Sequence, residues 1–296
     1  HIQYAPAEHN YRRSIGYLPL LLRLAGAEMP IVTTLHEYGN HEWQPALVPL
    51  SSMRRFHRWA EEHKAWDRET AFLLSFSDVI VSPNDATTRL ILSRFPQYES
   101  RLRQSWLAPP IELSLANRVT VKRRLQLDHN WPDNALIASY FGHINPQAGL
   151  LSLLKAFAQA KTLQPRLRLL LLSDPTALTS RGQISNTFQR KLQSEIKARK
   201  LSESVVICQA NTPALISNYL LASDFGVYTP DSGTTLRNTA IMSLLQHRLP
   251  LIMTRHRPPE VQLEKQPFTF VISPQQSEQL RSMLLILSRS SFMRQR

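Results

Sequence analysis

Two His-Glu pairs in the stretch TTLHEYGNHEW, residues 33–43, carry side chains that bind metals in many enzymes. A metalloprotease helix needs two histidines one helical turn apart, so that both imidazoles face one zinc ion. His36 and His41 are five residues apart, which in a helix turns the two rings roughly 140° away from each other. Gly39 and Asn40 between them favour a turn instead. The spacing therefore argues against zinc and indicates a polar loop.

Two other polar loops have compositions that suit an anionic or a sugar ligand. The first, GHINPQAG at 142–149, follows a strand-like run and leads into a helix, so its backbone N–H groups can hold a phosphate. The second, TPDSGTTLRN at 229–238, places a glycine, hydroxyl residues and an arginine ahead of a helix, which suits phosphate or sugar hydroxyls. A plain connecting loop and ordinary helix capping are the alternative explanations. The candidate ligand-binding residues are Gly142, His143, Asn145, Ser232, Gly233, Thr234, Thr235, Leu236, Arg237 and Asn238.

Strand-like apolar runs alternate with helical runs along the chain, which is typical of parallel sheets covered on both faces. In such sheets ligands bind beyond the carboxyl ends of the strands, where all three polar loops lie. The irregular stretch 108–117 marks a boundary between two domains, expected at 1–113 and 114–296, and we expect their loops to face one cleft. The expected strands are 1–4, 30–36, 77–83, 103–110, 135–142, 166–174, 204–209, 224–230, 249–254 and 268–273. The expected helices are 51–75, 150–160 and 236–247, with three more that begin near 85, 212 and 275.

The composition limits the class of protein. A net charge of +13 and a pI near 10.3 favour anionic partners, namely phosphorylated substrates, anionic lipid or nucleic acid. Nucleic acid ranks last, because the chain has no recognisable nucleic-acid module and no basic stripe with interleaved aromatic residues. A single cysteine, Cys208, excludes an internal disulfide and fits a reducing compartment. No apolar run is long enough to span a membrane. No charged and then apolar leader opens the sequence, so we expect no signal peptide. The opening HIQY already resembles a strand, which leads us to expect an N-terminally incomplete chain.

The helix expected over 51–75 combines an aromatic face, which carries Trp59 and Trp66, with a row of arginines. A basic helix with exposed aromatic residues favours reversible association with an anionic membrane surface. The alternative is that both tryptophans lie in the core and that the arginines form a solvated face.

The chain resembles the retaining, nucleotide-sugar-dependent glycosyltransferases of the GT-B class (group 1, family 4-like). The resemblance rests on the order and spacing of HIQYAP, PIVTTLHEY, SDVIVSP, YFGHINPQAGLLSLLKAF and SDFGVYTPDSGTTLRNTAIMSLLQHRLPLIMT. It implies an α/β fold of two Rossmann-like domains, of which the N-terminal one is incomplete here. It further implies that the N-terminal domain binds an acceptor and the C-terminal domain a nucleotide-diphosphate sugar, with metal-independent hexosyl transfer and no cofactor. A cytoplasmic protein, peripheral at the inner face of the membrane, fits this class.

The resemblance also assigns roles to individual residues. His36 matches the histidine that lies against the donor sugar in such enzymes; the alternative is a loop histidine that is hydrogen-bonded locally. The first acid of the family's paired-acid motif falls at Ser232, with Asp231 one residue earlier, and the second falls at Ser243. We therefore expect His36 and Asp231 to be the catalytic residues, and no residue to bind a metal.

The C-terminal part departs from the family at the donor diphosphate. The arginine and lysine that usually hold it are replaced by His143 and Ala148. Their loss removes charge stabilisation from the leaving group, for which a protonated His143 or Arg237 substitutes only in part. Two functions therefore stay open: an active glycosyltransferase with an unknown acceptor, and a catalytically impaired binding or partner module.

Overall fold

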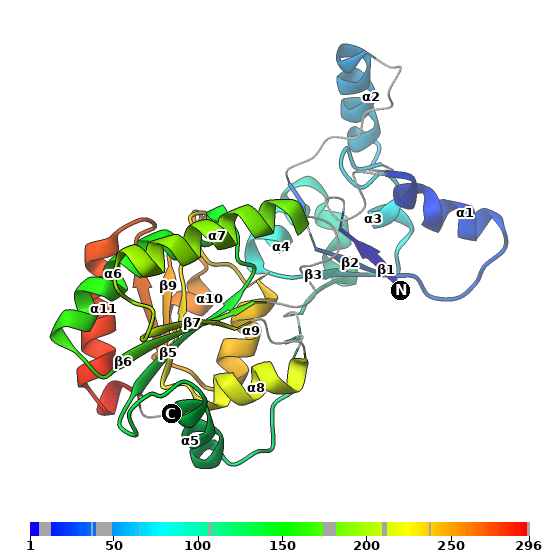
Figure 1. Ribbon diagram of the computed structural model, residues 1–296. Helices are drawn as coiled ribbons and strands as arrows, with labels where there is room; N and C mark the ends of the chain where they lie inside the picture. The colour runs from blue at the N-terminus through cyan, green and yellow to red at the C-terminus, as the bar shows by residue number, and fades with distance from the viewer. Residues whose placement is uncertain are drawn as a thin grey trace. The chain divides into compact units, whose positions relative to one another are not determined.

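The computed structural model describes residues 1–5, 13–36, 38–39, 49–64, 66–105, 108–109, 111–173, 182–208, 212–236 and 238–294. The chain separates into two compact units, His1–Leu107 and Ala108–Arg296, each built on a parallel sheet (Figure 1). This division lies between Leu107 and Ala108, at the start of the irregular stretch 108–117 that the sequence indicates. The exact domain limits of 1–113 and 114–296 stay a prediction.

The N-terminal unit contains a four-stranded parallel sheet in the order β1-β2-β3-β4. The strands are short, and Leu35 and Ile80 of the strands are fully buried in one core together with Ile91 of a covering helix. The strands are β1 (Ile2–Tyr4), β2 (Val32–Leu35), β3 (Val79–Ser82) and β4 (Leu102–Gln104). The helices are η1 (Arg13–Tyr17), α1 (Leu18–Leu24), α2 (Leu50–Glu62), α3 (Leu73–Phe76), α4 (Asp85–Arg94) and η2 (Pro96–Arg101).

The single helix expected over 51–75 is wrong. α2 ends at Glu62, and Lys64 and Ala71 both have positive φ angles, which a continuing helix does not allow. A tight turn follows, in which Asp67 and Ala71 exchange two backbone hydrogen bonds of 3.0 and 2.8 Å. The break separates the two tryptophans, because Trp66 is buried while Trp59 remains 57% exposed.

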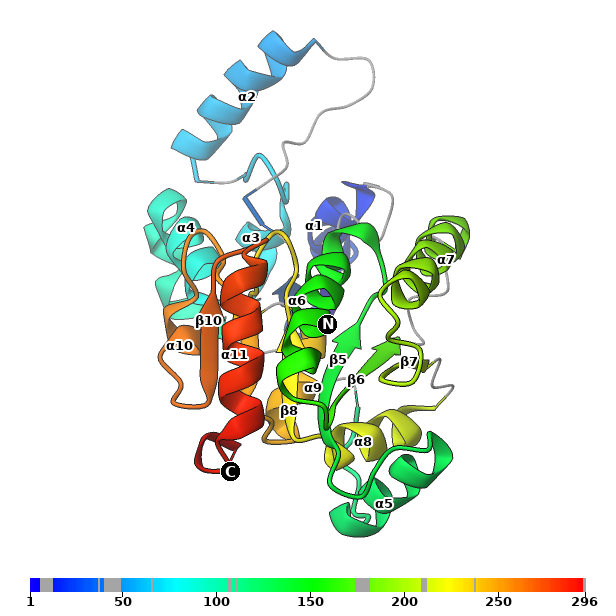
Figure 2. The same ribbon diagram turned by 60° about the vertical axis from the view of Figure 1, so that its left-hand side comes forward.

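The C-terminal unit contains a six-stranded parallel sheet in the order β10-β9-β8-β5-β6-β7. Both faces are covered, because its central strands are apolar on both sides and would otherwise expose them to water. One face packs against α6, α7 and α11, of which α6 and α11 lie side by side (Figure 2), and the other against α5, α8 and α9. The strands are β5 (Leu136–Gly142), β6 (Leu167–Ser173), β7 (Val205–Cys208), β8 (Phe225–Tyr228), β9 (Leu251–Thr254) and β10 (Thr269–Ile272). The helices are α5 (Arg118–Asp128), η3 (Pro146–Ala148), α6 (Leu150–Leu163), α7 (Gly182–Ala198), α8 (Pro213–Ala222), α9 (Thr239–Gln246), α10 (Val261–Glu264), α11 (Ser277–Arg289) and η5 (Phe292–Arg294).

Polar side chains fix the ends of several of these elements. The Thr212 hydroxyl accepts from Leu215 N at 3.3 Å, which confirms Thr212 as the cap of α8, while the alternative Asn211 lies outside the described residues. Asp224, just before β8, accepts hydrogen bonds from Ile137 N at 2.8 Å and from Lys122 Nζ at 2.7 Å. This buried carboxylate therefore ties α5 to the start of β5.

The positive charge is concentrated in one unit. Residues 1–107 contain twelve Lys and Arg against eleven Asp and Glu, whereas residues 108–296 contain twenty-three against eleven. The C-terminal unit thus carries a net charge of +12 out of +13. Within the described part of the chain, no helix is both long and apolar enough to cross a lipid bilayer.

Candidate functional site

The C-terminal unit has a topological switch point between β5 and β8. From β5 the chain adds β6 and β7 on one side, then returns to build β8, β9 and β10 on the other. Open parallel sheets bind ligands beyond the carboxyl ends of the two central strands at such a point. The loops that follow β5 and β8 are 142–149 and 229–238, the two polar loops that the sequence indicates.

The two loops pack directly on each other. Gly149 has a φ of +70°, and a Cβ atom built there would lie 1.8 Å from the backbone oxygen of Thr229. Asp231 N donates to Gln147 O at 2.9 Å. Because glycine alone permits this approach, the end of the first loop and the start of the second form one continuous surface.

In the first loop, the two positions at which the resemblance expects cations, His143 and Ala148, differ in exposure. His143 is exposed, and its backbone oxygen accepts a hydrogen bond of 2.9 Å from the hydroxyl of Tyr140. Asn145 is half-buried and accepts from Gln147 N at 3.0 Å, so its side chain shapes the turn η3. Ala148 is buried, with 5% of its surface exposed.

The second loop is held against the next strand. Gly233 has a φ of +83°, and a Cβ there would lie 2.4 Å from the backbone oxygen of Arg255, while Thr234 N donates to Thr254 O at 2.9 Å. Ser232 is exposed and Asp231 is half-buried. These two side chains are therefore the accessible polar groups among 231–236.

Several other predicted residues of this loop make contacts within the protein. Thr235 donates from its hydroxyl and its N–H to Asn238 Oδ1, at 3.1 and 2.8 Å. Thr234 is buried, and so is Leu236, with 1% of its surface exposed. Gly142 has a φ of +145° and lies beside Tyr140 and Tyr228. Arg237 lies outside the described residues, so the structure places nine of the ten predicted ligand-binding residues at this edge.

Two stacked tyrosines, Tyr140 of β5 and Tyr228 of β8, lie close to the first residue of these loops. The rings of Tyr140 and Tyr228 are stacked, with centroids 5.9 Å apart and planes inclined by 13°. Burial raises the pKa of Tyr228 to about 12 and that of Tyr140 well above its ordinary value. Both phenols therefore stay protonated at neutral pH, and Tyr140 remains the donor to His143 O.

Thr229 is a residue of the site that sequence reasoning missed. It follows the last residue of β8 and is 4% exposed. Its hydroxyl is buried and hydrogen-bonds to no described residue, which is uncommon for a buried polar atom. The only sequence signal was its position directly after the strand.

The predicted catalytic pair is divided between the two units. Asp231 belongs to the C-terminal unit, while His36 follows β2 in the N-terminal unit and is half-buried. The His36 imidazole Nε2 lies 2.5 Å from Gln3 Oε1 in a hydrogen bond. His41 and Glu37 lie outside the described residues, and the described residues include no group of three or more His, Cys, Asp or Glu side chains placed to hold a metal.

Comparison with known proteins shows similarity in structure but not in sequence. No family model matches the chain, and no curated protein matches it in sequence. A glycosyltransferase from Rickettsia africae ESF-5 is similar in structure at a TM-score of 0.58 and 12% identity, over 91% of this chain and 69% of that one. An α,α-trehalose 6-phosphate synthase from Burkholderia multivorans gives a TM-score of 0.58 at 14% identity, over 94% and 62%.

A third similar structure carries a ligand. It is described as trehalose-6-phosphate from E. coli bound with UDP-2-fluoro glucose, and it gives a TM-score of 0.58 at 13% identity, over 94% of this chain and 64% of that one. The chain thus spans about two thirds of the length of these structures. Two Rossmann-like α/β units in this order, each with a parallel sheet, give the chain the fold of the GT-B glycosyltransferases.

Proposed function

We propose that the chain takes part in retaining, metal-independent hexosyl transfer from a nucleotide-diphosphate sugar to an acceptor, with the donor bound at the β5–β8 switch point. One observation carries the proposal: the two polar loops meet at the position where open parallel sheets bind ligands. The similar E. coli structure, bound with UDP-2-fluoro glucose, supports a nucleotide sugar as the ligand class.

The accessible groups at this edge suit a diphosphate that gains negative charge as it leaves. The exposed His143 and Ser232 supply side-chain donors, and Arg237 adds a cation by sequence position. Asp231 and His36 are the residues we assign to the transferred sugar. Because Ala148 is buried and no lysine or arginine occurs in 142–149, charge stabilisation is weaker here than a paired arginine and lysine would provide.

The test restores the missing charge. His143→Arg should tighten binding of uridine diphosphate about tenfold, since a hydrogen bond to a permanent cation contributes about 1.5–3 kcal/mol. Calorimetry on the intact chain measures this effect, with His63→Arg, at the exposed residue that follows α2, as a control of equal charge. Equal affinities for both variants would remove the β5–α6 loop from the donor site.

Donor hydrolysis by the unmodified chain distinguishes an enzyme from a partner module. We expect release of the nucleoside diphosphate from nucleotide sugars, unchanged by EDTA. Binding of the nucleotide sugar without turnover would favour the impaired module. Activity that is lost in EDTA and restored by manganese would contradict the metal-free mechanism.

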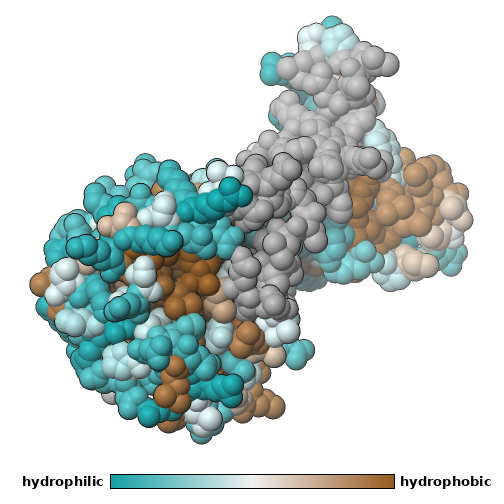
Figure 3. Space-filling model, in the orientation of Figure 1, coloured by the Kyte–Doolittle hydropathy of each residue, from teal (hydrophilic) through white to brown (hydrophobic). Residues whose placement is uncertain are grey.

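We also propose an anionic membrane surface, at the inner face of the cytoplasmic membrane, as a partner of the N-terminal unit. α2 exposes Arg54, Arg55 and Arg58, none of which forms an ion pair with any described residue, and 57% of Trp59. In the same unit α1 exposes an apolar stripe, brown in Figure 3. The stripe consists of Leu18, Leu21, Leu24 and the nearby Met29. Free arginines attract anionic headgroups, and exposed apolar side chains insert beneath them.

Vesicle co-sedimentation tests this partner. Changing Arg54, Arg55 and Arg58 to glutamine should reduce binding to anionic vesicles at low salt about a hundredfold, because each basic residue near the surface contributes about 1 kcal/mol. The control changes three exposed basic residues of α7, Arg190, Lys191 and Lys197, and so alters the net charge equally. An equal loss in both variants would assign the binding to overall charge instead of α2.

A further inference from the structure

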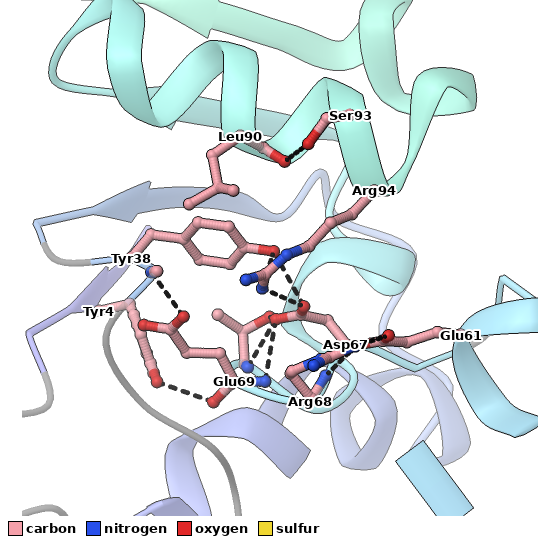
Figure 4. Close-up of polar contacts among 11 residues, drawn as sticks. Tyr4, Tyr38, Glu61, Asp67, Arg68, Glu69, Leu90, Ser93 and Arg94 are labelled. Carbon is pink, nitrogen blue, oxygen red and sulfur yellow. Dashed lines mark hydrogen bonds and ion pairs between the residues drawn. The ribbon is translucent and has the colours of Figure 1, made fainter. Parts of the chain in front are cut away.

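The turn that interrupts the expected helix carries two buried carboxylates. Asp67 and Glu69 are each 2% exposed and come from the segment Asp67–Ala71, which closes on itself by two backbone hydrogen bonds. Figure 4 shows both side chains pointing toward Tyr38 and the chain that follows β2. A buried carboxylate costs several kcal/mol unless hydrogen bonds compensate, so the contacts of this pair define what it does.

Asp67 uses its two oxygens differently. Oδ2 accepts from Thr70 N and Thr70 Oγ1, both at 2.7 Å, which fixes the turn itself. Oδ1 accepts from the hydroxyl of Tyr38 at 2.9 Å and lies 3.7 Å from the guanidinium of Arg94, which also stacks over the Tyr38 ring at 5.2 Å. Burial raises the pKa of Asp67, whereas the bonds from Thr70 and Tyr38 oppose that rise. Asp67 thus connects a rigid turn to Tyr38.

Glu69 reaches the backbone beyond Tyr38. Its Oε2 accepts from Gly39 N at 2.6 Å, and its backbone oxygen accepts from the hydroxyl of Tyr4 at 2.9 Å. Tyr4 is the last residue of β1, and its own backbone oxygen accepts from His36 N at 2.9 Å. Gly39 has a φ of +101°, a conformation that other residues rarely adopt. The segment from His36 to Gly39 is therefore held at both ends.

From this network we infer that Glu69 is a positioning residue, whose carboxylate holds the backbone after β2 so that His36 presents one fixed orientation at the carboxyl edge of its sheet. The inference rests on the proposed function, in which His36 contacts the transferred sugar. A charge-assisted bond to a backbone N–H is roughly twice as strong as a neutral one. The acid thus holds a left-handed glycine in place more firmly than a neutral side chain does.

The experiment compares Glu69→Gln and Glu69→Leu in the intact chain. Glutamine keeps an acceptor oxygen and removes the charge, whereas leucine removes the acceptor. We expect the Gly39 amide to exchange with deuterium at least tenfold faster in Glu69→Leu, with an intermediate rate in Glu69→Gln. The rates of amides in the core strands β2 and β3 should be unchanged. Glu99→Gln, at an exposed carboxylate of η2, is the control.

Turnover provides the second measurement. Misplacing a contact by about 1 Å can cost a hundredfold in rate, so kcat should fall in Glu69→Leu and partly recover in Glu69→Gln, while the affinity for uridine diphosphate stays unchanged. A fall in nucleotide affinity equal to the fall in kcat would mean general damage and would overturn the inference. So would a Gly39 amide that exchanges equally fast in all variants. Protection of Gly39 in a wild-type chain without any sugar transfer would instead refute the proposed function and leave the backbone contact standing.

Discussion

Gly149→Ala is expected to destabilise the C-terminal unit by about 3 kcal/mol and to abolish nucleotide binding. The φ of +70° costs alanine about 1–2 kcal/mol. The added methyl group would also lie 1.8 Å from the backbone oxygen of Thr229, so the β5–α6 loop must move off the end of β8 at a further cost of about 1–3 kcal/mol. Chemical denaturation measures the loss of stability, and calorimetry with uridine diphosphate measures the loss of the site.

Gly26→Ala separates the two contributions. Gly26 follows α1 with a φ of +81°, and a Cβ there would have no atom within 4 Å. Alanine at position 26 therefore has the unfavourable positive φ angle but no steric clash. The substitution should destabilise the N-terminal unit by only about 1 kcal/mol. If both variants lost the same amount, the contact between Gly149 and Thr229 would not hold the loops together.

Asp224→Ala should be the most damaging change away from the loops, at about 3 kcal/mol. The carboxylate accepts from Ile137 N at 2.8 Å and lies 2.7 Å from Lys122 Nζ and 3.1 Å from Arg118. Its removal leaves a buried N–H at the start of β5 and a half-buried ammonium without their partner. Urea denaturation checks the value.

The matching control is Asp133→Ala, because Asp133 also binds an arginine of α5. Both partners of that ion pair are exposed: 73% of the Asp133 side chain and 52% of the Arg123 side chain. Water screens such a pair, so the control should leave stability almost unchanged. A comparable loss in both variants would show that burial of Asp224 does not decide its contribution.

The positions of the central strands could be predicted because each of them has a local signal. A run such as RLRLLLLSD is apolar on both faces, which indicates a strand covered on both sides, and the structure has β6 there. The polar loops were found by the same logic, since they directly follow strands. Helix caps such as Thr212 also depend on neighbouring residues only.

The features that sequence reasoning missed depend on contacts between distant residues. Apolar residues near helical spacing indicate one helix over 51–75, but the buried Asp67 closes a turn with Thr70 and also accepts a hydrogen bond from Tyr38, 29 residues away. Likewise, Thr229 belongs to the site because Gly149, at the end of the loop that follows β5, lies against it. The periodicity of apolar residues carries no information about contacts between distant residues. The two loops of the candidate site could therefore be predicted from the sequence, but the contacts between them could not.

The contact between Gly149 and Thr229 is needed for folding, so selection for a stable fold conserves it. The exposed residues of the same loops are not needed for folding and are free to change. Position 149 must remain glycine for the β5–α6 loop to pack against Thr229, whether or not the chain turns over a substrate. The side chains of His143 and Ser232 are exposed, and neither supports a neighbouring element in the described part of the chain. In relatives of this chain, loss of transfer activity would therefore leave Gly149 intact, and mutational drift would appear first at His143 and Ser232.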